Sequence, residues 1–193
     1  DPVPVIITKN ITIELDENGA KTITPEEIDN GSSSVVGLSG LSLDITSFDC
    51  SNIGENTVNL TVTSNLGNSI SAPAIVTVID NIAPVINTPA ALTVNTNNDD
   101  CGHTFETPLS AGATDNCGIE SVIGTRSDGL ALTDIYPVGE TVITWVATDV
   151  NGNISNQGNG GSGSYSNQIF TNPSQFSNDA VVFKRSFSTS SFM

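Results

Sequence analysis

Apolar and polar residues alternate most clearly between residues 142 and 147. Val142, Thr144 and Val146 alternate there with Ile143, Trp145 and Ala147. A period of two residues is typical of a β-strand with one face on a hydrophobic core. Residues 149–153 (DVNGN) follow at once and are turn formers. The pattern therefore predicts a strand that runs into a tight turn, with Trp145 in the core and its indole nitrogen bonded to a backbone acceptor.

The same stretch occurs earlier in the chain. Residues 53–68 (IGENTVNLTVTSNLGN) align without a gap with residues 138–153 (VGETVITWVATDVNGN). Pro4 and Pro84 begin matching segments, and in the same alignment Ser34 matches Asp115 and Ser64 matches Asp149. The chain is therefore a tandem repeat of units of about 80 residues.

Further strands are expected wherever apolar residues alternate with Thr, Ser and Asn. The expected strands cover residues 5–8, 11–15, 21–24, 41–48, 58–62 and 74–79 in the first repeat, and 85–86, 92–94, 103–105, 119–123, 130–132 and 142–147 in the second. One helical turn is expected after Thr24, where Pro25 and two acidic residues follow a capping residue. These elements predict an all-β fold of two tandem β-sandwich domains, residues 1–79 and 80–156.

The second repeat lacks a counterpart of the strand at residues 74–79. Residues 157–167 are instead rich in Gly, Ser and Asn and are expected to form a flexible linker. The tail, residues 168–193, has strand-like segments that could complete the sandwich of its own chain or of a neighbouring molecule. The residues expected to make this assembly contact are Val181, Phe183, Lys184, Arg185 and Phe187. Donation to a neighbour would propagate into a filament.

Several short motifs of the second repeat resemble the hyalin repeat. They are Asp80 with Pro84, Asp99-Asp-Cys101-Gly, Ala113-Thr-Asp-Asn-Cys117, Tyr136-Pro-Val-Gly139 and Thr148-Asp-Val-Asn-Gly-Asn153. The resemblance covers residues 80–153 closely and residues 1–79 more loosely. It implies immunoglobulin-like β-sandwiches, which occur in strings on secreted and cell-surface proteins, in adhesion and without catalysis.

The resemblance also implies a disulfide between Cys101 and Cys117. Cys50 is then left over, because the position that matches Cys117 in the first repeat is Val36. We expect Cys50 to be a buried free thiol or, alternatively, to form an intermolecular bond. A disulfide in turn favours an oxidising, extracellular or cell-surface location.

The chain is strongly acidic, with a formal net charge of −16 from 21 acidic and 5 basic residues. Such a surface repels phosphate backbones and anionic lipid head groups, so nucleic acid is excluded as a partner. No apolar run approaches the roughly 20 residues that span a bilayer, which argues against membrane insertion. The acidic residues serve either solubility or the binding of divalent ions.

Calcium is the one cofactor that the sequence supports. Asp80, Asp115, Asp149 and Asn151 offer oxygen atoms in predicted loops, and calcium prefers six to eight oxygen ligands. The alternative is that these side chains only stabilise turns by accepting hydrogen bonds from backbone amides.

Catalytic residues are scarce. His103 is the single histidine, and its neighbours Cys101 and Phe105 place it on a predicted strand beside the implied disulfide, so it lacks a plausible nucleophile-and-base constellation. We therefore expect a non-enzymatic structural or adhesive protein, an adhesin or a filament subunit, whose partner is itself or a surface protein or glycan. The alternative is a spacer or ligand-binding accessory region of a larger secreted enzyme or of a phage fibre. The start at Asp1 suggests a processed or excised product.

Overall fold

The computed structural model describes residues 3–87, 89–97 and 101–155, together with the backbone of residues 166–172. The chain packs as two compact units. Unit 1 comprises Asp1–Thr88, Ala111–Gly124 and Trp145–Ser166, and unit 2 comprises Pro89–Ser110, Thr125–Thr144 and Asn167–Met193. The division into domains 1–79 and 80–156 remains a prediction from the repeat.

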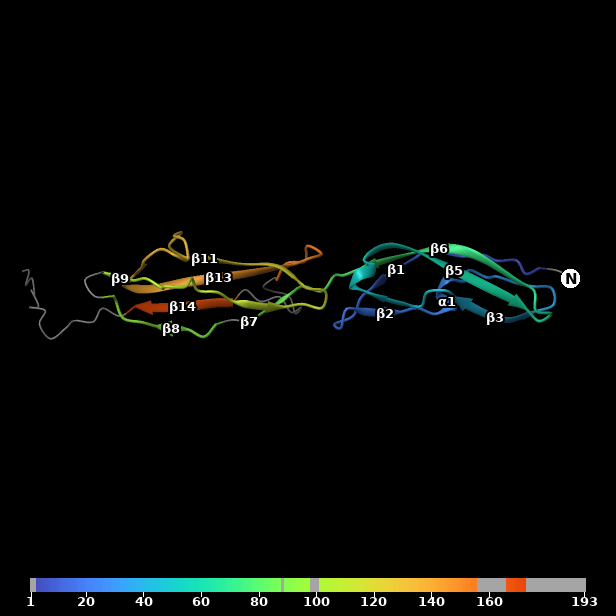
Figure 1. The fold of residues 1–193 in the computed structure, drawn as a ribbon, viewed down its shortest axis with the longest axis horizontal. Coiled ribbons are helices and arrows are strands. Elements are labelled where there is room, and N and C mark those ends of the chain that lie inside the picture. The colour runs from blue at the N-terminus through green and yellow to red at the C-terminus, as the bar shows by residue number, and fades with distance from the viewer. Residues whose placement is uncertain (1–2, 88, 98–100, 156–165, 173–193) are drawn as a thin grey trace, which may run out of the picture. The chain divides into compact units, whose positions relative to one another are not determined.

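Nearly every regular element is a strand (Figure 1). The strands are β1 (Ile11–Glu14), β2 (Ala20–Thr22), β3 (Leu38–Leu43), β4 (Ser47–Asp49), β5 (Gly54–Ser64), β6 (Ser69–Ile79), β7 (Val85–Asn87), β8 (Leu92–Thr93), β9 (Gly102–His103), β10 (Gly112–Thr114), β11 (Ile119–Arg126), β12 (Tyr136–Pro137), β13 (Gly139–Asp149) and β14 (Ser166–Asn172). Two short helices, α1 (Pro25–Ile28) and the 3-10 helix η1 (Cys50–Asn52), complete the described elements. The predicted all-β, immunoglobulin-like sandwich class is confirmed.

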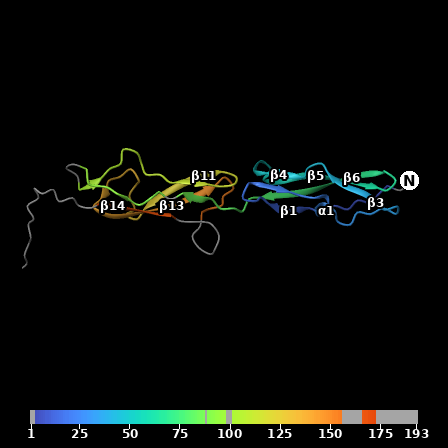
Figure 2. The same cartoon turned by 90° about the horizontal axis from the view of Figure 1, so that it is seen from below.

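A four-stranded sheet in the order β1-β6-β5-β3 dominates unit 1. Its centre is the antiparallel hairpin of β5 and β6, which lie side by side in both views (Figures 1 and 2) and pair from Gly54–Val78 to Thr63–Ser69. β4 supplies Phe48 and the helix α1 supplies Ile28 to the same core. The core residues are Ile13, Leu15, Ile23, Ile28, Phe48, Val58, Leu60, Val62, Ala74, Val76 and Val78.

The predicted helical turn is confirmed at α1. The backbone amide of Thr24 donates to Glu27 Oε2 at 2.7 Å, which satisfies a donor at the start of the helix. Ile28 ends the helix and is fully buried in the core. The acidic first turn therefore points to solvent, while the helix contributes one apolar side chain to the interior.

Burial along β13 follows the predicted alternation, with Ile143, Trp145 and Ala147 on the buried face. Trp145 is 2% exposed, so its predicted core position is confirmed. The predicted hydrogen bond is wrong, because its Nε1 is buried without a partner among the described residues. The ring instead fills the space beside Gly124 of β11, where an added Cβ would lie 2.5 Å from Cζ3 of the indole. Ring packing, rather than a polar contact, fixes the side chain.

The C-terminal strand of the described chain fills the place that the sequence predicts to be missing. β14 lies between β13 and β8 in a four-stranded sheet of order β11-β13-β14-β8. It runs parallel to β8, with Phe170 opposite Leu92 and Thr171 opposite Thr93. The sheet is therefore closed by a strand of the same chain. The expected assembly residues Val181, Phe183, Lys184, Arg185 and Phe187 lie outside the described residues.

Residues 130–132 form a loop, and the predicted strand there is wrong. The cause is Arg126 of unit 2, whose guanidinium is fully buried and takes its acceptors from this loop. It donates to the carbonyl oxygens of Ala131 at 2.8 Å, Asp134 at 2.9 Å and Ile135 at 3.0 Å. It also lies 3.8 Å over the ring of Tyr136. Carbonyls that turn inward to this cation cannot join a sheet ladder.

Asp128 neutralises this buried cation, and we predict that the pair makes unit 2 sensitive to acid. Burial raises the pKa of Asp128, but hydrogen bonds from Arg126 and from the amide of Leu130 outweigh it and place the pKa below its ordinary value. A lowered pKa in the folded state means that the stabilisation is complete above about pH 4, the ordinary Asp value, and is lost as the pH falls through the lowered pKa.

Asp128→Asn should therefore cost about 1.5 to 3 kcal/mol at pH 7, since it removes a hydrogen bond between charged groups. The difference from the wild type should shrink as the pH drops below about 4. Urea unfolding across a pH series measures this difference in the free energy of unfolding. Glu120→Gln is the control, because Glu120 is an exposed acidic residue on β11. A difference that is the same at pH 3 and pH 7 would contradict this account.

Gly124 provides a second test of the packing. Gly124→Ala should destabilise the protein by about 1 to 3 kcal/mol, because the new methyl group overlaps the Trp145 ring. Gly40→Ala on β3 is the matched control, since nothing lies within 4 Å of its added Cβ. Thermal and urea unfolding compare the two variants. Equal stabilities would show that the ring can move aside without cost.

Candidate metal centre

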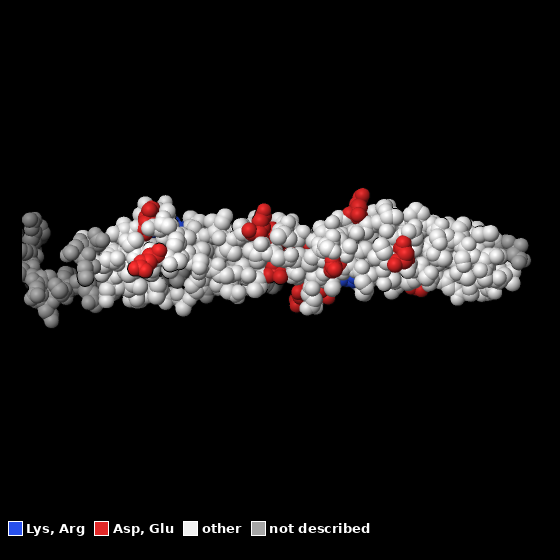
Figure 3. Space-filling model, viewed as in Figure 1, with Lys and Arg blue, Asp and Glu red and all other residues white. Residues whose placement is uncertain are grey.

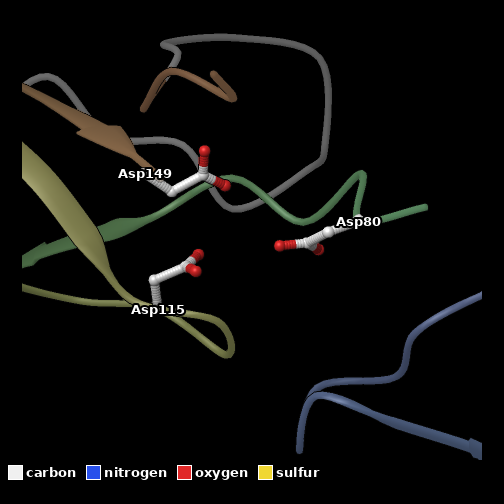
Figure 4. A group of neighbouring side chains, drawn as sticks. All are labelled: Asp80, Asp115 and Asp149. Carbon is white, nitrogen blue, oxygen red and sulfur yellow. The ribbon is translucent and has the colours of Figure 1, made fainter. Parts of the chain in front are cut away.

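Three aspartates of unit 1 bring their carboxylates together. Asp80 follows β6 directly, Asp115 follows β10, and Asp149 is the last residue of β13. One carboxylate oxygen from each lies within 4.8 Å of the other two. Figure 4 shows the three side chains pointing toward a common centre. The sequence thus supplies the three acids from loops that are far apart in the chain.

Amide groups anchor Asp149, which is fully buried. Its Oδ1 accepts from the backbone amides of Asn151 at 2.9 Å and Asn153 at 2.7 Å. Its Oδ2 accepts from Nδ2 of Asn153 at 2.8 Å. The same Nδ2 donates to the backbone oxygen of Asp80 at 3.1 Å. Asn153 therefore ties two of the three acidic residues to each other.

Asp115 and Asp80 are each anchored through one oxygen only. Asp115 Oδ1 accepts from the amides of Cys117 at 2.9 Å and Gly118 at 3.1 Å. Asp80 Oδ1 accepts from the amide of Ile82 and from Nδ2 of Asn116, both at 3.1 Å. Their Oδ2 atoms, and Oδ1 of Asn116, are buried without a hydrogen-bond partner among the described residues. Three buried oxygen acceptors thus remain to be satisfied.

The electrostatics of this cluster favour a cation. Two carboxylates at 4.8 Å repel each other by about 3 kcal/mol at an effective dielectric constant of about 20. Asp80 is 7% exposed, so water relieves little of this repulsion. The one ion pair between two described residues joins Arg126 to Asp128, in unit 2. The hydrogen bonds above come from neutral amides, which orient the carboxylates but do not cancel their charge.

The residues present fit a calcium ion. Calcium takes hard oxygen ligands in flexible geometry, and this cluster offers carboxylate oxygens that no N–H group satisfies. Turn stabilisation accounts for the Oδ1 atoms, which accept hydrogen bonds from backbone amides. It does not account for the Oδ2 atoms of Asp80 and Asp115, and calcium binding at these atoms stays a prediction. The remaining coordination positions would fall to water or to Oδ1 of Asn116.

The structure brings together three of the four predicted ligand residues. Asn151 has a different place, because its backbone amide binds Asp149 while its residue is exposed. Sequence reasoning missed Asn116 and Asn153, whose side-chain amides orient the cluster. Both lie in the turns that the sequence analysis identified. The signal that could have found them is a side-chain amide one residue after Asp115 and another four residues after Asp149.

The first repeat provides an internal comparison. The Ser64 hydroxyl accepts from the amide of Asn68 at 3.2 Å, as Asp149 accepts from Asn153. The Ser34 hydroxyl accepts from the amide of Val36 at 3.4 Å, as Asp115 accepts from Cys117. A neutral hydroxyl therefore makes the same turns without a carboxylate. Turn formation alone does not require the charge at residues 115 and 149.

The predicted disulfide between Cys101 and Cys117 is wrong. Cys117 is bonded to Cys50, with the two Cα atoms 5.4 Å apart, and Cys101 is an exposed free cysteine. Cys50 is therefore not a free thiol either. The reason is spatial: η1 places Cys50 beside the turn that begins at Asp115, both in unit 1, whereas Cys101 belongs to unit 2. The repeat alignment compares equivalent positions and cannot reveal a bond between non-equivalent ones.

His103 occupies β9 in unit 2. Its Nδ1 lies 2.7 Å from the carbonyl oxygen of Asn95, which requires this nitrogen to donate. Its ring packs against Phe105 with the centroids 4.6 Å apart. These contacts are those of a structural histidine.

The helices within the described residues are all too short and polar to cross a membrane.

No protein family and no curated protein matches this sequence. Among solved structures, the chain is similar to the fibronectin(III)-like modules of Clostridium thermocellum CbhA, with a TM-score of 0.33 and 14% identity over 89% of this chain and 95% of that chain. It is also similar to the extracellular cadherin domains 1–4 of protocadherin gamma B7, with a TM-score of 0.37 and 13% identity over 90% of this chain and 51% of that chain. A third similar structure is EC1-2 of human protocadherin-24, with a TM-score of 0.37 and 15% identity over 91% of this chain and 100% of that chain. At such low TM-scores the similarity carries no functional argument, and function is inferred from the residues of this chain.

Proposed function

We propose that this chain is a non-enzymatic, extracellular structural protein of the hyalin-repeat type, stabilised by calcium at Asp80, Asp115 and Asp149. The observation that carries the proposal is a cluster of three carboxylates in which one oxygen of each lies within 4.8 Å of the other two. The Oδ2 atoms of Asp80 and Asp115 are buried without a hydrogen-bond partner among the described residues. Burying this charge without a cation would cost stability and confer nothing on the fold.

Two further observations support an extracellular location. The Cys50–Cys117 bond requires an oxidising compartment to form and persist. Its loop spans 67 residues, which corresponds to about 4 kcal/mol of stabilisation on the entropic model. Acidic side chains also occur along the face in Figure 3, on which Lys and Arg are barely visible. A site made for calcium would be filled where calcium is abundant, as in extracellular modules with dissociation constants of about 0.1 to 1 mM.

An adhesin or filament subunit fits these properties better than an enzyme does. His103, the single histidine, already uses Nδ1 in a backbone hydrogen bond and packs edge-on against the ring of Phe105. The partner is a second copy of the chain or a surface protein or glycan. The alternative, a spacer or accessory region of a larger secreted enzyme or phage fibre, uses the same rigid, calcium-dependent modules without self-assembly.

Calcium should raise the free energy of unfolding by about 2.7 kcal/mol at a concentration one hundred times its dissociation constant. For a chain of this size that corresponds to a rise in Tm of about 5 to 10 °C. Asp115→Asn keeps the Oδ1 acceptor but removes charge at Oδ2, so it should abolish the calcium response. Thermal unfolding in calcium and in chelator gives the Tm shift of the wild type and of Asp115→Asn.

Asp44→Asn is the matched control. Asp44 also holds a turn, accepting from the amide of Asn59 at 2.8 Å and from its Nδ2 at 2.7 Å, but it is not part of the cluster. Its variant should keep the full calcium response. A wild-type Tm that is identical in calcium and chelator, together with no heat of calcium binding, would refute the proposal.

Self-assembly is the finer part of the proposal. Because β14 closes the sheet within its own chain, assembly would require exchange of this strand between molecules. β14 lies between β13 and β8. The identical strand of a neighbouring molecule could take its place by domain swapping. Deleting residues 166–193 should therefore abolish any filaments seen by electron microscopy, while calcium binding in unit 1 persists. Filaments of unchanged length and number after the deletion would exclude strand exchange and favour the spacer alternative.

A further inference from the structure

The turn from Asp115 to Gly118 connects the disulfide to the proposed calcium site. Cys117 carries the sulfur bonded to Cys50, and its own backbone amide donates to Asp115 Oδ1 at 2.9 Å. The residue that fixes the carboxylate is thus itself fixed covalently to η1. Both cysteines and all three carboxylates belong to unit 1.

Asn116, between these two residues, extends the connection to a second carboxylate. Its Nδ2 donates to Asp80 Oδ1 at 3.1 Å and to the backbone oxygen of Asp16 at 3.2 Å. A displacement of this turn would therefore move Asp115 directly and release one of the two hydrogen bonds that orient Asp80. Two of the three acidic ligands depend on the position of one turn.

The turn of Asp16 to Ala20 packs tightly against the disulfide from the other side. Gly19 has a φ of +70°, and an added Cβ would lie 2.7 Å from Cys50 Sγ and 2.8 Å from the backbone oxygen of Asn116. Asp16 closes this turn by accepting from the amides of Asn18 at 2.9 Å and Ala20 at 3.0 Å. Three loops thus meet at the sulfur atoms without spare space.

We propose that the Cys50–Cys117 disulfide positions Asp115 and Asp80 for calcium, so that the oxidation state of this bond sets the calcium affinity. The inference rests on the proposed calcium site. By thermodynamic linkage, calcium must protect the disulfide from reduction by the same factor by which the disulfide strengthens calcium binding. Couplings of this kind amount to about 5- to 150-fold in affinity, and we expect about tenfold here.

The chemical step is the ordinary reduction of a disulfide by an external dithiol. The S–S bond between Cys50 and Cys117 breaks, each sulfur gains one electron and one proton, and the dithiol is oxidised to its own cyclic disulfide. The turn from Asp115 to Gly118 is then held by hydrogen bonds and packing alone. The acidic ligands lose their covalent support, while the residues that bind calcium are unchanged.

A bond with a purely structural role makes a different prediction. Its loss would lower Tm, but the calcium affinity of the folded protein would stay the same, and calcium would not affect the reduction of the bond as long as the reduced protein stays folded. The coupling therefore has two readouts that general destabilisation does not move.

The test measures calcium binding by titration calorimetry on the full chain. The wild type is compared with Cys50→Ser/Cys117→Ser, and Cys101→Ser is the matched control because it removes the exposed free cysteine and keeps the bond. The double variant should bind calcium about tenfold more weakly, and the control should bind as the wild type does. Europium luminescence lifetimes should report more water molecules on the ion in the double variant than in the control.

A second measurement tests the same coupling without substituting Cys50 or Cys117, at a temperature at which circular dichroism shows that the reduced protein stays folded. In the Cys101→Ser protein, the fraction of reduced Cys50–Cys117 is titrated against dithiol in calcium and in chelator. Calcium should raise the dithiol-to-oxidised-dithiol ratio needed for half reduction about tenfold. An unchanged ratio, or equal calcium affinities in the folded double variant and the control, would overturn the coupling. If the oxidised wild type binds no calcium at all, the proposed function fails and the coupling fails with it.

Discussion

Repulsion among three neighbouring carboxylates, two of them on buried residues, is the constraint on which the local structure depends. Asp80, Asp115 and Asp149 come from separate loops of unit 1, and each is held in place by neutral amide donors. Amides can aim a carboxylate but leave its charge, so the cluster remains anionic in the middle of tight turns. Under the proposed function, a divalent cation would offset this charge at the point where the loops meet, and one ion would then contact residues of β13, of the turn after β10 and of the segment after β6.

The internal repeat separates the role of the turns from the role of the charge. Strands β5 and β13 have the same length and end in turns with the same backbone hydrogen bonds: Gly67 to Ser64 in one, Gly152 to Asp149 in the other. In the first repeat the hydroxyl of Ser64 accepts the hydrogen bond from the backbone amide of Asn68 that stabilises this turn. Formation of this turn therefore does not require the carboxylate of Asp149, and the proposed calcium site would give that carboxylate a role.

The sequence pattern correctly predicted the elements whose formation depends on interactions within a few residues. The alternation at residues 142–147 gave β13 and its buried face, and the capping residue with Pro25 gave α1, because strand alternation and helix capping act over a few residues. The aspartates of the site were identified because turn chemistry and oxygen ligands involve the same residue types. The all-β class followed from many such segments together.

The predictions that were wrong concern features that depend on contacts between residues distant in sequence. Cys117 bonds to Cys50 because η1 lies beside its turn, and a repeat alignment carries no information on that proximity. The loop at residues 130–132 follows from the demand of buried Arg126 for carbonyl acceptors, which overrides the strand preference of its sequence. The indole of Trp145 is fixed by the absence of a side chain at Gly124 and not by a polar partner.

The most direct test of a cation at the centre of this structure is anomalous diffraction from crystals of the full chain grown with terbium, which replaces calcium at oxygen sites. The account predicts one strong peak at about 2.3 to 2.6 Å from the Oδ2 atoms of Asp80 and Asp115 and from an oxygen of Asp149. Crystals with no peak there, in which water molecules hydrogen-bond to those oxygens instead, would contradict it.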